Sequence, residues 1–392
     1  MNDEQVINAL QSLTTIRQRA AKLLSLARQN KSAYFYLDET KMATTADYVI
    51  EVIYENYPDL EIPYHSRWRH FEVGGIDRCK LFVGEESLGK IKIELVIIAV
   101  FMDAGAGENW RYYEQKTGQF YTRSEGLALA SFDLYRQGRF SVDAKAPWRV
   151  DAASLLDFSE ASLGQGFQVS TENPLLGLQG RLALLHRLGV IVKDKLDGRL
   201  GNFYTYLLAL AENNCLAADK LFDAVLTTFS FLWPERLRYH GVSLGDVWQH
   251  QALLEVFMPF HKLSQWLTYS LIEPLEQSGM AVTDLEKLTA LAEYRNGGLL
   301  IDTGLLCVKN EKILHEPQAM DSEVIVEWRA LTIALIDELA AAIRQRLKLS
   351  AKELPLAKIL QGGTWDAGRR IAKQKRAKGI PPITVVSDGT LL

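Results

Sequence analysis

The chain has 392 residues, three cysteines and a formal net charge of -4. With 48% hydrophobic and 10% aromatic residues it can bury a large core, which excludes a disordered protein. The acidic balance gives no general attraction for nucleic acid or anionic membranes, so any basic site must be local. The cysteines are far apart and form no CxxC pair, which argues against structural zinc and against a disulfide framework.

Targeting and cofactor motifs are missing from the sequence. The start, MNDEQVINAL, lacks a basic leader, and the longest clear apolar run, LVIIAVFM at 95–102, is far shorter than the ~20 residues of a membrane helix. We find no HExxH, Walker loop, GxSxG or His/Asp cluster at metal spacing, so we expect no metal and no cofactor. These observations predict a cytoplasmic protein that acts without a membrane.

Helical periodicity dominates the chain, and strand patterns are few and short. In chain order, the predicted helices cover residues 4–28, 44–54, 174–189, 283–298 and 322–347. The predicted strands are 32–37, 80–83 and the ITVV segment near the C-terminus. Since no repeat, low-complexity tract or long linker divides the chain, we predict a mainly α fold with a few short strands. It would form one compact multi-helix domain over 1–392, or two closely packed lobes.

A basic segment, HSRWRHF, brings His65, Arg67, Arg69 and His70 together, with Arg78 just beyond it. Two arginines spaced by two lie on one side of an extended segment, and a guanidinium binds phosphate with a planar fork of donors. This segment is therefore the best candidate for phosphate binding, and a solvated basic turn is the alternative. The KQKRAK run at 373–378 lacks interleaved aromatic residues and is interpreted as a solvated face, so no nucleic-acid partner is expected.

Two segments downstream combine acids with aromatic or small residues. MDAGAGENWRYYE, at 102–114, offers Asp103 and then Trp110 and Tyr112, whose rings can stack on a base or sugar. The alternative is the end of a helix with its turn. In RSEGLALA, Glu125 falls in the first turn of a predicted helix, where the helix dipole stabilises an acid and favours a structural role.

PFHKLSQWLTYSL, at 259–271, supplies His261 and Lys262 as further candidates. Since His261 and Gln265 are four apart, they share one helical face. A lone histidine in such a place is more often a hydrogen-bonded core residue than a catalyst.

LTALAEYRNGGLL, at 288–300, carries Glu293 and Arg295 two residues apart in an apolar helical stretch that we expect to end on the two glycines. Opposite charges share a helical face only three or four apart, so at least one of them should point toward the apolar side. A charge there must be paired or put to use. Glu327 and Arg329 in VEWRALT repeat this spacing, and buried ion pairs explain both cases from the residues alone.

Nine stretches carry a resemblance to a known family. They are HSRWRHFEVGGIDR, MDAGAGENWRYYE, RSEGLALAS, NPLLGLQGR, PFHKLSQWLTYSLIEPL, LAEYRNGGLLIDTG, VEWRALT, QGGTWDAGR and the terminal SDGTLL. Together they resemble the uracil-catabolism proteins of fungi and bacteria, a family of unknown function. That family accompanies a uracil phosphoribosyltransferase and a relative of GTP cyclohydrolase in a route through UMP, ring opening and urea release. The resemblance implies a step that cuts a ribosyl ureide from its sugar.

A more distant resemblance bears on that step. LTALAEYRNGGLLIDTGLL is similar to a segment of the queuosine-salvage N-glycosylases, which are helical hydrolases related in fold to helix-hairpin-helix glycosylases. Their acid lies at the C–N bond that they cleave. The matching acid is Glu293, where that family is expected to have aspartate.

The two resemblances imply a metal-independent N-ribosyl hydrolase that converts a ribosylurea phosphate-like nucleotide to urea and ribose phosphate. Cleavage builds positive charge on the sugar, so Glu293 is expected to stabilise that charge and to orient or deprotonate water. The candidates for protonating the ureide are Asp103, Glu125 and His261. The expected substrate-binding residues are His65, Arg67, Arg69, Arg78, Trp110, Tyr112, Lys262, Arg295, Glu327 and Arg329.

Other interpretations of the same residues stay open. Arg295 is expected to pair inside the protein with Glu327 or Asp302, while a purely structural interpretation pairs Glu293 with Arg329. A non-catalytic sensor or scaffold that binds UMP or a ureide is the alternative function. An amidohydrolase-like step on the ureide is disfavoured, because no nucleophile and base pair is evident.

Overall fold

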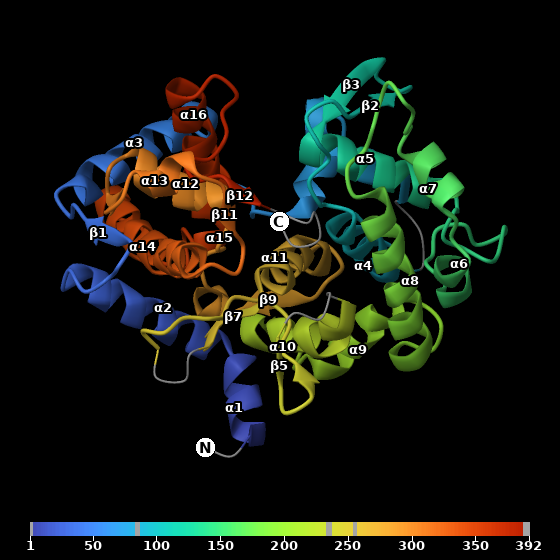
Figure 1. Ribbon diagram of the computed structural model, residues 1–392. Coiled ribbons are helices and arrows are strands. Elements are labelled where there is room, and N and C mark those ends of the chain that lie inside the picture. Colours follow the sequence, from blue (N-terminus) through green and yellow to red (C-terminus); the bar gives the residue numbers. More distant parts are fainter. Residues whose placement is uncertain (1–2, 83–86, 233–236, 254–256, 387–392) are drawn as a thin grey trace. The chain divides into compact units, whose positions relative to one another are not determined.

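The computed structural model describes residues 3–82, 87–232, 237–253 and 257–386 (Figure 1). They are mainly helical, with short two-stranded sheets, which confirms the predicted fold class. The chain divides into two compact units of interleaved segments. The first unit contains Met1–His65, Glu235–Gln265 and Asp284–Ser387, and the second contains Ser66–Pro234, Trp266–Thr283 and Asp388–Leu392.

The first unit is organised around α14, the longest described helix. Its helices are α1 (Asp3–Leu10), α2 (Leu13–Arg28), α3 (Lys41–Asn56), α12 (Tyr294–Asp302), α13 (Lys312–His315), α14 (Glu323–Leu347), α15 (Leu356–Ile359) and α16 (Trp365–Lys375). The residues from Val324 to Ile336 are all buried, so this part of α14 is covered on every side. Helices α2, α3 and α12 pack against α14, and α16 packs against α12 (Figure 1).

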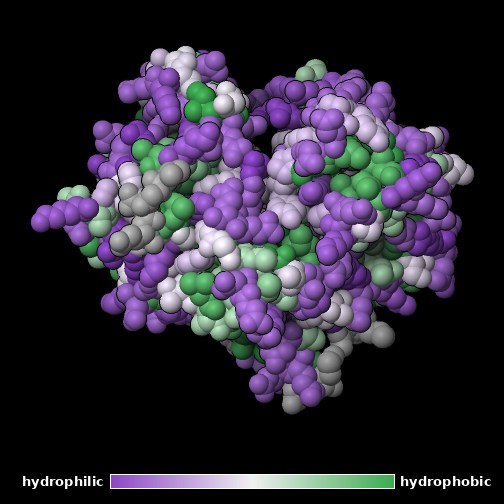
Figure 2. Space-filling view, turned by 180° about the vertical axis from the view of Figure 1, so that it is seen from behind, coloured by the Kyte–Doolittle hydropathy of each residue, from purple (hydrophilic) through white to green (hydrophobic). Residues whose placement is uncertain are grey.

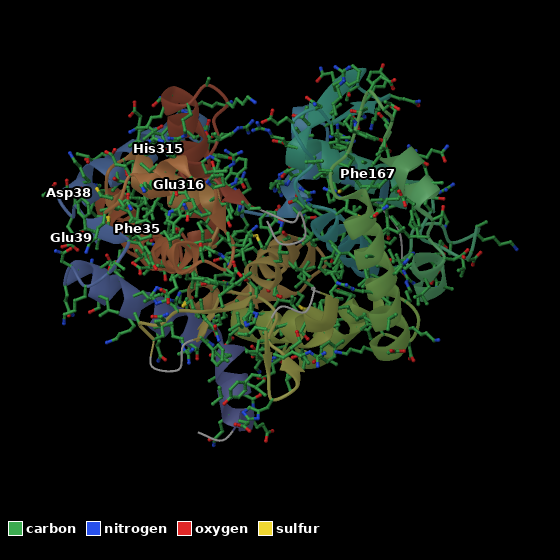
Figure 3. The ribbon with its side chains drawn as sticks, viewed as in Figure 1. Phe35, Asp38, Glu39, Phe167, His315 and Glu316 are labelled. Atoms are coloured by element: carbon green, nitrogen blue, oxygen red, sulfur yellow. The ribbon has the colours of Figure 1, made fainter. Side chains whose placement is uncertain are left out.

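Short strand pairs join the loops of the first unit. The antiparallel pairs are β1 (Phe35–Leu37) with β10 (Leu306–Val308), β5 (Arg238–Tyr239) with β6 (Val242–Ser243), and β7 (Val247–Gln249) with β8 (Phe257–Pro259). One pair is parallel, β11 (Gln318–Ala319) with β12 (Val385–Val386). In Figure 3 the labelled Phe35 lies on β1, where it is fully buried.

The second unit contains the apolar run at 95–102, of which residues 95–101 lie in a buried helix. Its helices are α4 (Leu88–Phe101), α5 (Arg123–Arg136), α6 (Ala152–Leu156), α7 (Glu160–Gly166), α8 (Leu178–Lys195), α9 (Asn202–Leu210) and α10 (Ala218–Phe229). Every residue from Ile91 to Phe101 is buried, and α5, α8 and α9 pack on α4. Among the described residues, no helix has the length and hydropathy needed to cross a membrane.

Two strand pairs and one shared helix complete the second unit. The hairpin joins β2 (Arg111–Glu114) to β3 (Gln119–Thr122), and the parallel pair joins β4 (Cys215–Ala217) to β9 (Ala281–Thr283). The chain passes from the first unit to the second within α11 (Lys262–Glu276). The face drawn in Figure 2 is mostly hydrophilic, interrupted by small hydrophobic groups, which is ordinary for a folded surface.

The structure differs from several of the predicted elements, each time for a local reason. The segment at 78–82 is a 3-10 helix rather than a strand, and Val83 lies outside the described residues. The segment from Arg67 to Gly75 is also 3-10 helical, so its arginines are not spaced as on an extended strand. The helix predicted to close at Gly189 continues to Lys195. A Cβ at Gly189 would lie 2.9 Å from the Leu156 side chain, so this glycine permits close packing of α6 on α8.

A further difference concerns the stretch around Glu293. Thr283 ends β9, Asp284 adopts a positive φ of 57°, and only a short 3-10 turn follows at Leu285–Lys287. The regular helix begins at Tyr294 and runs to Asp302, so the two glycines are helical and do not end a helix. The helix predicted at 283–298 was therefore placed about ten residues too early.

Close contact between α12 and α16 depends on Gly368. A Cβ there would overlap the backbone carbonyl oxygen of Arg295, which cannot rotate away. Ala has a helix propensity about 1 kcal/mol better than Gly, but overpacking a rigid contact costs about 1–3 kcal/mol. We therefore expect Gly368→Ala to lower the midpoint of denaturant unfolding. Gly164→Ala is the matched control, since the nearest atom to its Cβ is 3.7 Å away, and it should be neutral or stabilising. Equal midpoints in both variants would contradict this account of the α12–α16 contact.

Candidate functional site

Glu293 caps the N-terminus of α12. Its backbone is extended, with φ -118° and ψ 155°, and its two carboxylate oxygens accept hydrogen bonds from the N–H groups of Asn296 at 2.8 Å and Arg295 at 3.1 Å. These donors have no partner within the helix, and a negative charge is favourable at this end of the helix dipole. The helix start therefore fixes the orientation of the carboxylate while the residue stays partly exposed.

The surroundings of Glu293 alter its proton affinity. Burial raises the pKa of the Glu293 carboxyl above its usual value, against the opposing effects of the Lys262 charge and the two amide donors. A carboxyl in such a setting holds its proton more tightly than glutamate in water. Perturbed carboxyls of this kind are typical of acid–base sites, although structural acids show them too.

Tyr294, which the sequence analysis did not single out, lies directly beside this acid. Its ring stacks on Trp328 with centroids 5.2 Å apart and planes 10° from parallel. Its hydroxyl is buried and has no hydrogen-bond partner among the described residues. Burial raises the pKa of Tyr294 to about 12, so the phenol is neutral at pH 7 and keeps a proton to donate.

The two acids expected to pair with Arg295 contact other residues. Glu327 accepts from Ser32 and lies 3.1 Å from His250, while Asp302 pairs with Arg376.

The Arg295 guanidinium instead lies over the Trp365 ring, with its carbon 5.2 Å from the ring centroid. The guanidinium of Arg369 is 5.8 Å from the same centroid. His65 completes this group, since its ring is 6.2 Å from that of Trp365 and its Nδ1 is 3.0 Å from Gln361 Oε1.

Arg329 pairs with Asp246 and not with Glu293. Its two terminal nitrogens donate to the two oxygens of Asp246 at 3.0 and 2.8 Å, and both side chains are buried. Trp248 and the backbone N–H of Lys262 also donate to this carboxylate. Although burial opposes ionisation, the Arg329 guanidinium holds the pKa of Asp246 well below its usual value. Arg329 is therefore part of a buried ion pair, but its acidic partner is Asp246. The predicted alternative, a pair between Glu293 and Arg329, is not formed.

His261 is a buried residue just before α11. Its Nε2 lies 2.9 Å from the backbone carbonyl oxygen of Leu10, and its φ of 45° is unusual for a non-glycine residue. Burial lowers the pKa of its imidazole, so the ring is neutral at pH 7 and donates to this carbonyl. This geometry is that of a hydrogen-bonded core histidine.

In the second unit, Arg67 is fully buried at the C-terminal end of α4. It donates to the carbonyl oxygens of Ala99 at 3.2 Å and Ser124 at 3.0 Å, and it lies 3.2 Å from Asp103. Arg181 donates in the same region, to the carbonyl of Met102 at 3.0 Å. The last carbonyl groups of a helix have no partner within the helix. Both arginines therefore donate hydrogen bonds to carbonyl groups at the C-terminal end of α4. Glu125 lies nearby in the first turn of α5, where its charge acts on Arg67.

Arg69 and Arg78 have acidic partners within the same unit. Arg69 pairs with Glu72 and Glu273. Arg78 is buried, donates to both oxygens of Glu114, and donates from its remaining terminal nitrogen to three backbone carbonyls. An arginine with all its nitrogens engaged has no fork to offer a phosphate.

Trp110 and Tyr112 are buried at the hairpin of the second unit. Trp110 donates from Nε1 to the carbonyl oxygen of Phe167 at 2.9 Å, and Phe167 is labelled in Figure 3. Tyr112 donates its hydroxyl to Asp133 at 2.5 Å. Both rings are almost fully buried, at 1% and 4% exposure, so their faces pack in the core of this unit.

The sequence candidates therefore fall into two groups. Those of the first unit are His65, His261, Lys262, Glu293, Arg295, Glu327 and Arg329, and those of the second are Arg67, Arg69, Arg78, Asp103, Trp110, Tyr112 and Glu125. Tyr294, Trp365 and Arg369 were missed. Trp365 and Arg369 are four apart in QGGTWDAGR, a spacing that could have indicated one helical face. No group of three metal-ligating residues was found in the described parts of the chain.

A pocket of about 480 Å³ lies elsewhere on the first unit, between α2, α3 and α14. Arg28 and Glu39 line it, and Arg28 pairs with Glu39 and with Glu338 across it. Figure 3 labels Glu39 just after β1. None of the candidate residues lines this pocket, so it carries no argument for the chemistry.

The arrangement in the first unit is that of a helix-capping acid beside an aromatic and cationic cluster, in a mainly helical protein. Comparison with known proteins shows that residues 9–392 match the family described as "Protein of unknown function (DUF1688)", and the chain belongs to that family. It is 38% identical to "Protein urg3" of Schizosaccharomyces pombe over 405 residues, and 33% identical to "Uracil catabolism protein 4" of Lachancea kluyveri over 442 residues. Both matches cover the whole of each chain. These comparisons confirm the family expected from the sequence motifs.

Proposed function

We propose that this protein is a hydrolase of uracil catabolism that cleaves the N-ribosyl bond of a ring-opened uracil nucleotide. The products would be urea and ribose phosphate. The single observation that carries this proposal is the placement of Glu293, a partly exposed acid whose two oxygens are oriented by the start of α12. The names of two full-length relatives supply the pathway.

The proposed reaction breaks the bond between the anomeric carbon and the ureide nitrogen. Water adds its oxygen to the anomeric carbon, and Glu293 accepts the proton that the water loses. As the bond breaks, positive charge develops on the sugar, and the carboxylate of Glu293 stabilises it. The ureide nitrogen gains one proton and leaves as part of urea.

The leaving nitrogen needs a proton donor. Asp103, Glu125 and His261 remain the predictions made from sequence. Tyr294 is the better proposal in the first unit, because its neutral hydroxyl is buried without a hydrogen-bond partner among the described residues and follows Glu293 in the chain. His261 already donates to Leu10.

The direct test is to incubate the purified protein with ribosylurea 5'-phosphate and, separately, with UMP. Urea and ribose 5-phosphate are followed by mass spectrometry. Release of both products from the ureide alone supports the hydrolase. Binding of either compound without turnover would overturn it in favour of a sensor or scaffold of the same pathway.

The pH dependence of the reaction follows from Glu293 and Lys262. Glu293 must be ionised to accept a proton, so kcat/KM should fall as the pH drops through its pKa in the free enzyme. Since burial raises that pKa, the midpoint should lie above the ordinary glutamate value of about 4.3. Lys262→Met removes a charge that lowers the Glu293 pKa, so it should move the midpoint to higher pH, while Lys262→Arg should not. An acid limb unaffected by Lys262→Met would argue against Glu293 as the titrating group.

A further inference from the structure

Asn296 holds a side-chain amide that is buried without a partner. The residue is only 1% exposed. Its Oδ1 is buried and accepts no hydrogen bond, and its Nδ2 donates none among the described residues. A carboxamide has two donor hydrogens and an acceptor oxygen, and leaving such groups unpaired inside a protein lowers its stability. Buried polar groups without a partner are rare, so this amide needs an explanation.

The usual structural role of a polar residue at this position is not filled. Asn296 is the third residue of α12, where a side chain often reaches back to the backbone N–H of the capping residue. Here the Glu293 N–H donates to the carbonyl oxygen of Leu291 at 2.9 Å. The backbone N–H of Asn296 does bind the Glu293 carboxylate, but any residue except proline would supply that donor. The cap therefore uses the backbone of Asn296 and not its amide.

The Asn296 amide lies beside the proposed acid. Glu293 Oε1 is 2.8 Å from the Asn296 backbone nitrogen, and covalent geometry keeps the amide carbon of Asn296 within about 4 Å of that nitrogen. The two residues are three positions apart, which places their side chains on one side of the helix start. Since Glu293 is partly exposed, a ligand that reaches this acid also comes close to the amide.

We propose that the Asn296 amide binds the terminal amide of a ureide leaving group. This assignment rests on the proposed function and specifies what its site recognises. A carboxamide presents an acceptor oxygen and a donor N–H side by side. The C(=O)–NH2 end of a ureide presents the same two groups, so the two ends can form a pair of parallel hydrogen bonds. A ligand without this edge leaves the buried amide unpaired, which makes the discrimination strong.

The test measures binding without turnover. Ribosylurea 5'-phosphate and its acetamide analogue, in which methyl replaces the terminal NH2, are titrated by calorimetry into the full-length Glu293→Gln protein. The analogue should bind about tenfold to a hundredfold more weakly than the ureide, the range for two lost hydrogen bonds. Adding Asn296→Leu should weaken ureide binding by a similar factor. It should leave binding of the analogue unchanged, because the pair of hydrogen bonds is already absent there.

Stability is a second measurement, in which a structural role would act in the opposite direction. Leucine has a shape close to that of asparagine and no polar side-chain atoms. Asn296→Leu in the otherwise wild-type chain should therefore leave the midpoint of denaturant unfolding unchanged or raise it. Asn202→Leu is the matched control, because the Asn202 amide donates to the carbonyl oxygen of Leu196 at 3.0 Å and accepts from Lys90 at 2.9 Å. It should lower the midpoint and leave ureide binding unchanged.

The outcomes separate this assignment from the proposed hydrolase. Ureide binding that is absent, or equal with and without Asn296→Leu, would overturn the assignment. A fall in the unfolding midpoint of Asn296→Leu as large as that of Asn202→Leu would do the same, because the amide would then have a partner in the folded chain. Hydrolysis by the wild-type protein beside any of these results would keep the hydrolase. Binding that depends on Asn296 and on the terminal NH2, with no hydrolysis by the wild-type protein, would keep the site and reject the hydrolase.

Discussion

Glu293→Gln is expected to abolish hydrolysis of ribosylurea 5'-phosphate while leaving the protein folded. The amide cannot accept the proton from water and carries no charge to oppose that on the sugar. General-base assistance contributes about a hundredfold to ten-thousandfold in rate, so kcat should fall by at least that range. The measurement is urea release under saturating substrate, beside a thermal unfolding curve of the same preparation.

The small stability effect follows from two opposing contributions. Glutamine keeps one oxygen that can accept from a first-turn N–H of α12, but it loses the favourable charge at the helix start. In return it removes a carboxylate that burial disfavours, as the raised pKa of Glu293 shows. Glu293→Ala is the control for loss of the helix cap alone, and it should lower the free energy of unfolding by about 0.5–2 kcal/mol. Full activity in Glu293→Gln would exclude this residue from catalysis, and collapse of its fold would assign it a structural role.

The sequence predicted the helical class and the family, because both depend on patterns that recur along the chain. Hydrophobic periodicity marks α2 and α14 clearly, and nine motifs together carried the family resemblance. The division into two units could not be predicted in the same way. Each unit is assembled from three separate segments, and one boundary, between Gln265 and Trp266, falls inside helix α11, where no linker marks it in the sequence.

The stretch around Glu293 shows how an incorrect element can still contain the right residue. The pair Glu293 and Arg295 was noticed because charges two apart do not share a helical face, and the expected helix, at residues 283–298, ran through both of them and ended on the two glycines. The structure places the helix after Glu293, which turns the acid into a cap. Gly297 lies within α12 and allows this helix to pack closely against α14. A Cβ on Gly297 would lie 2.7 Å from Thr332 Oγ1 and 2.8 Å from the Trp328 ring.

The phosphate candidates of the second unit have acidic partners that their spacing in the sequence does not show. Arg67, Arg69 and Arg78 attract attention as a basic cluster, yet their acidic partners come from residues as distant as Glu273. Arg295 and Arg369 are 74 positions apart and meet only because Gly368 lets α16 reach the start of α12. A local pattern reports charges that are near in sequence, while the fold determines which residues each charge contacts.

The ion pair between Asp246 and Arg329 should be the most costly to break of the contacts around the site. Arg329→Met would leave a buried carboxylate with only the Trp248 and Lys262 donors, and breaking a buried pair in this way costs about 3–5 kcal/mol. The double variant Asp246→Asn with Arg329→Met removes both charges and keeps an acceptor oxygen for one of those two donors. The double variant should recover a large part of the stability that Arg329→Met loses, as measured by the midpoint of denaturant unfolding at pH 7.

The pH dependence separates lost charge pairing from lost packing. In the wild-type protein the pKa of Asp246 is depressed, so its contribution to stability is present above the ordinary aspartate pKa and is lost as the pH falls through the folded pKa. In Arg329→Met the same carboxyl is buried without its cation, so its pKa should rise and protonation should stabilise the folded state. The stability gap between the two proteins should therefore shrink as the pH is lowered from 7 toward 5. A gap that stays constant over this range would mean that the methionine disturbs the packing around Phe260, over which the Arg329 guanidinium lies, and that the charge pair contributes little.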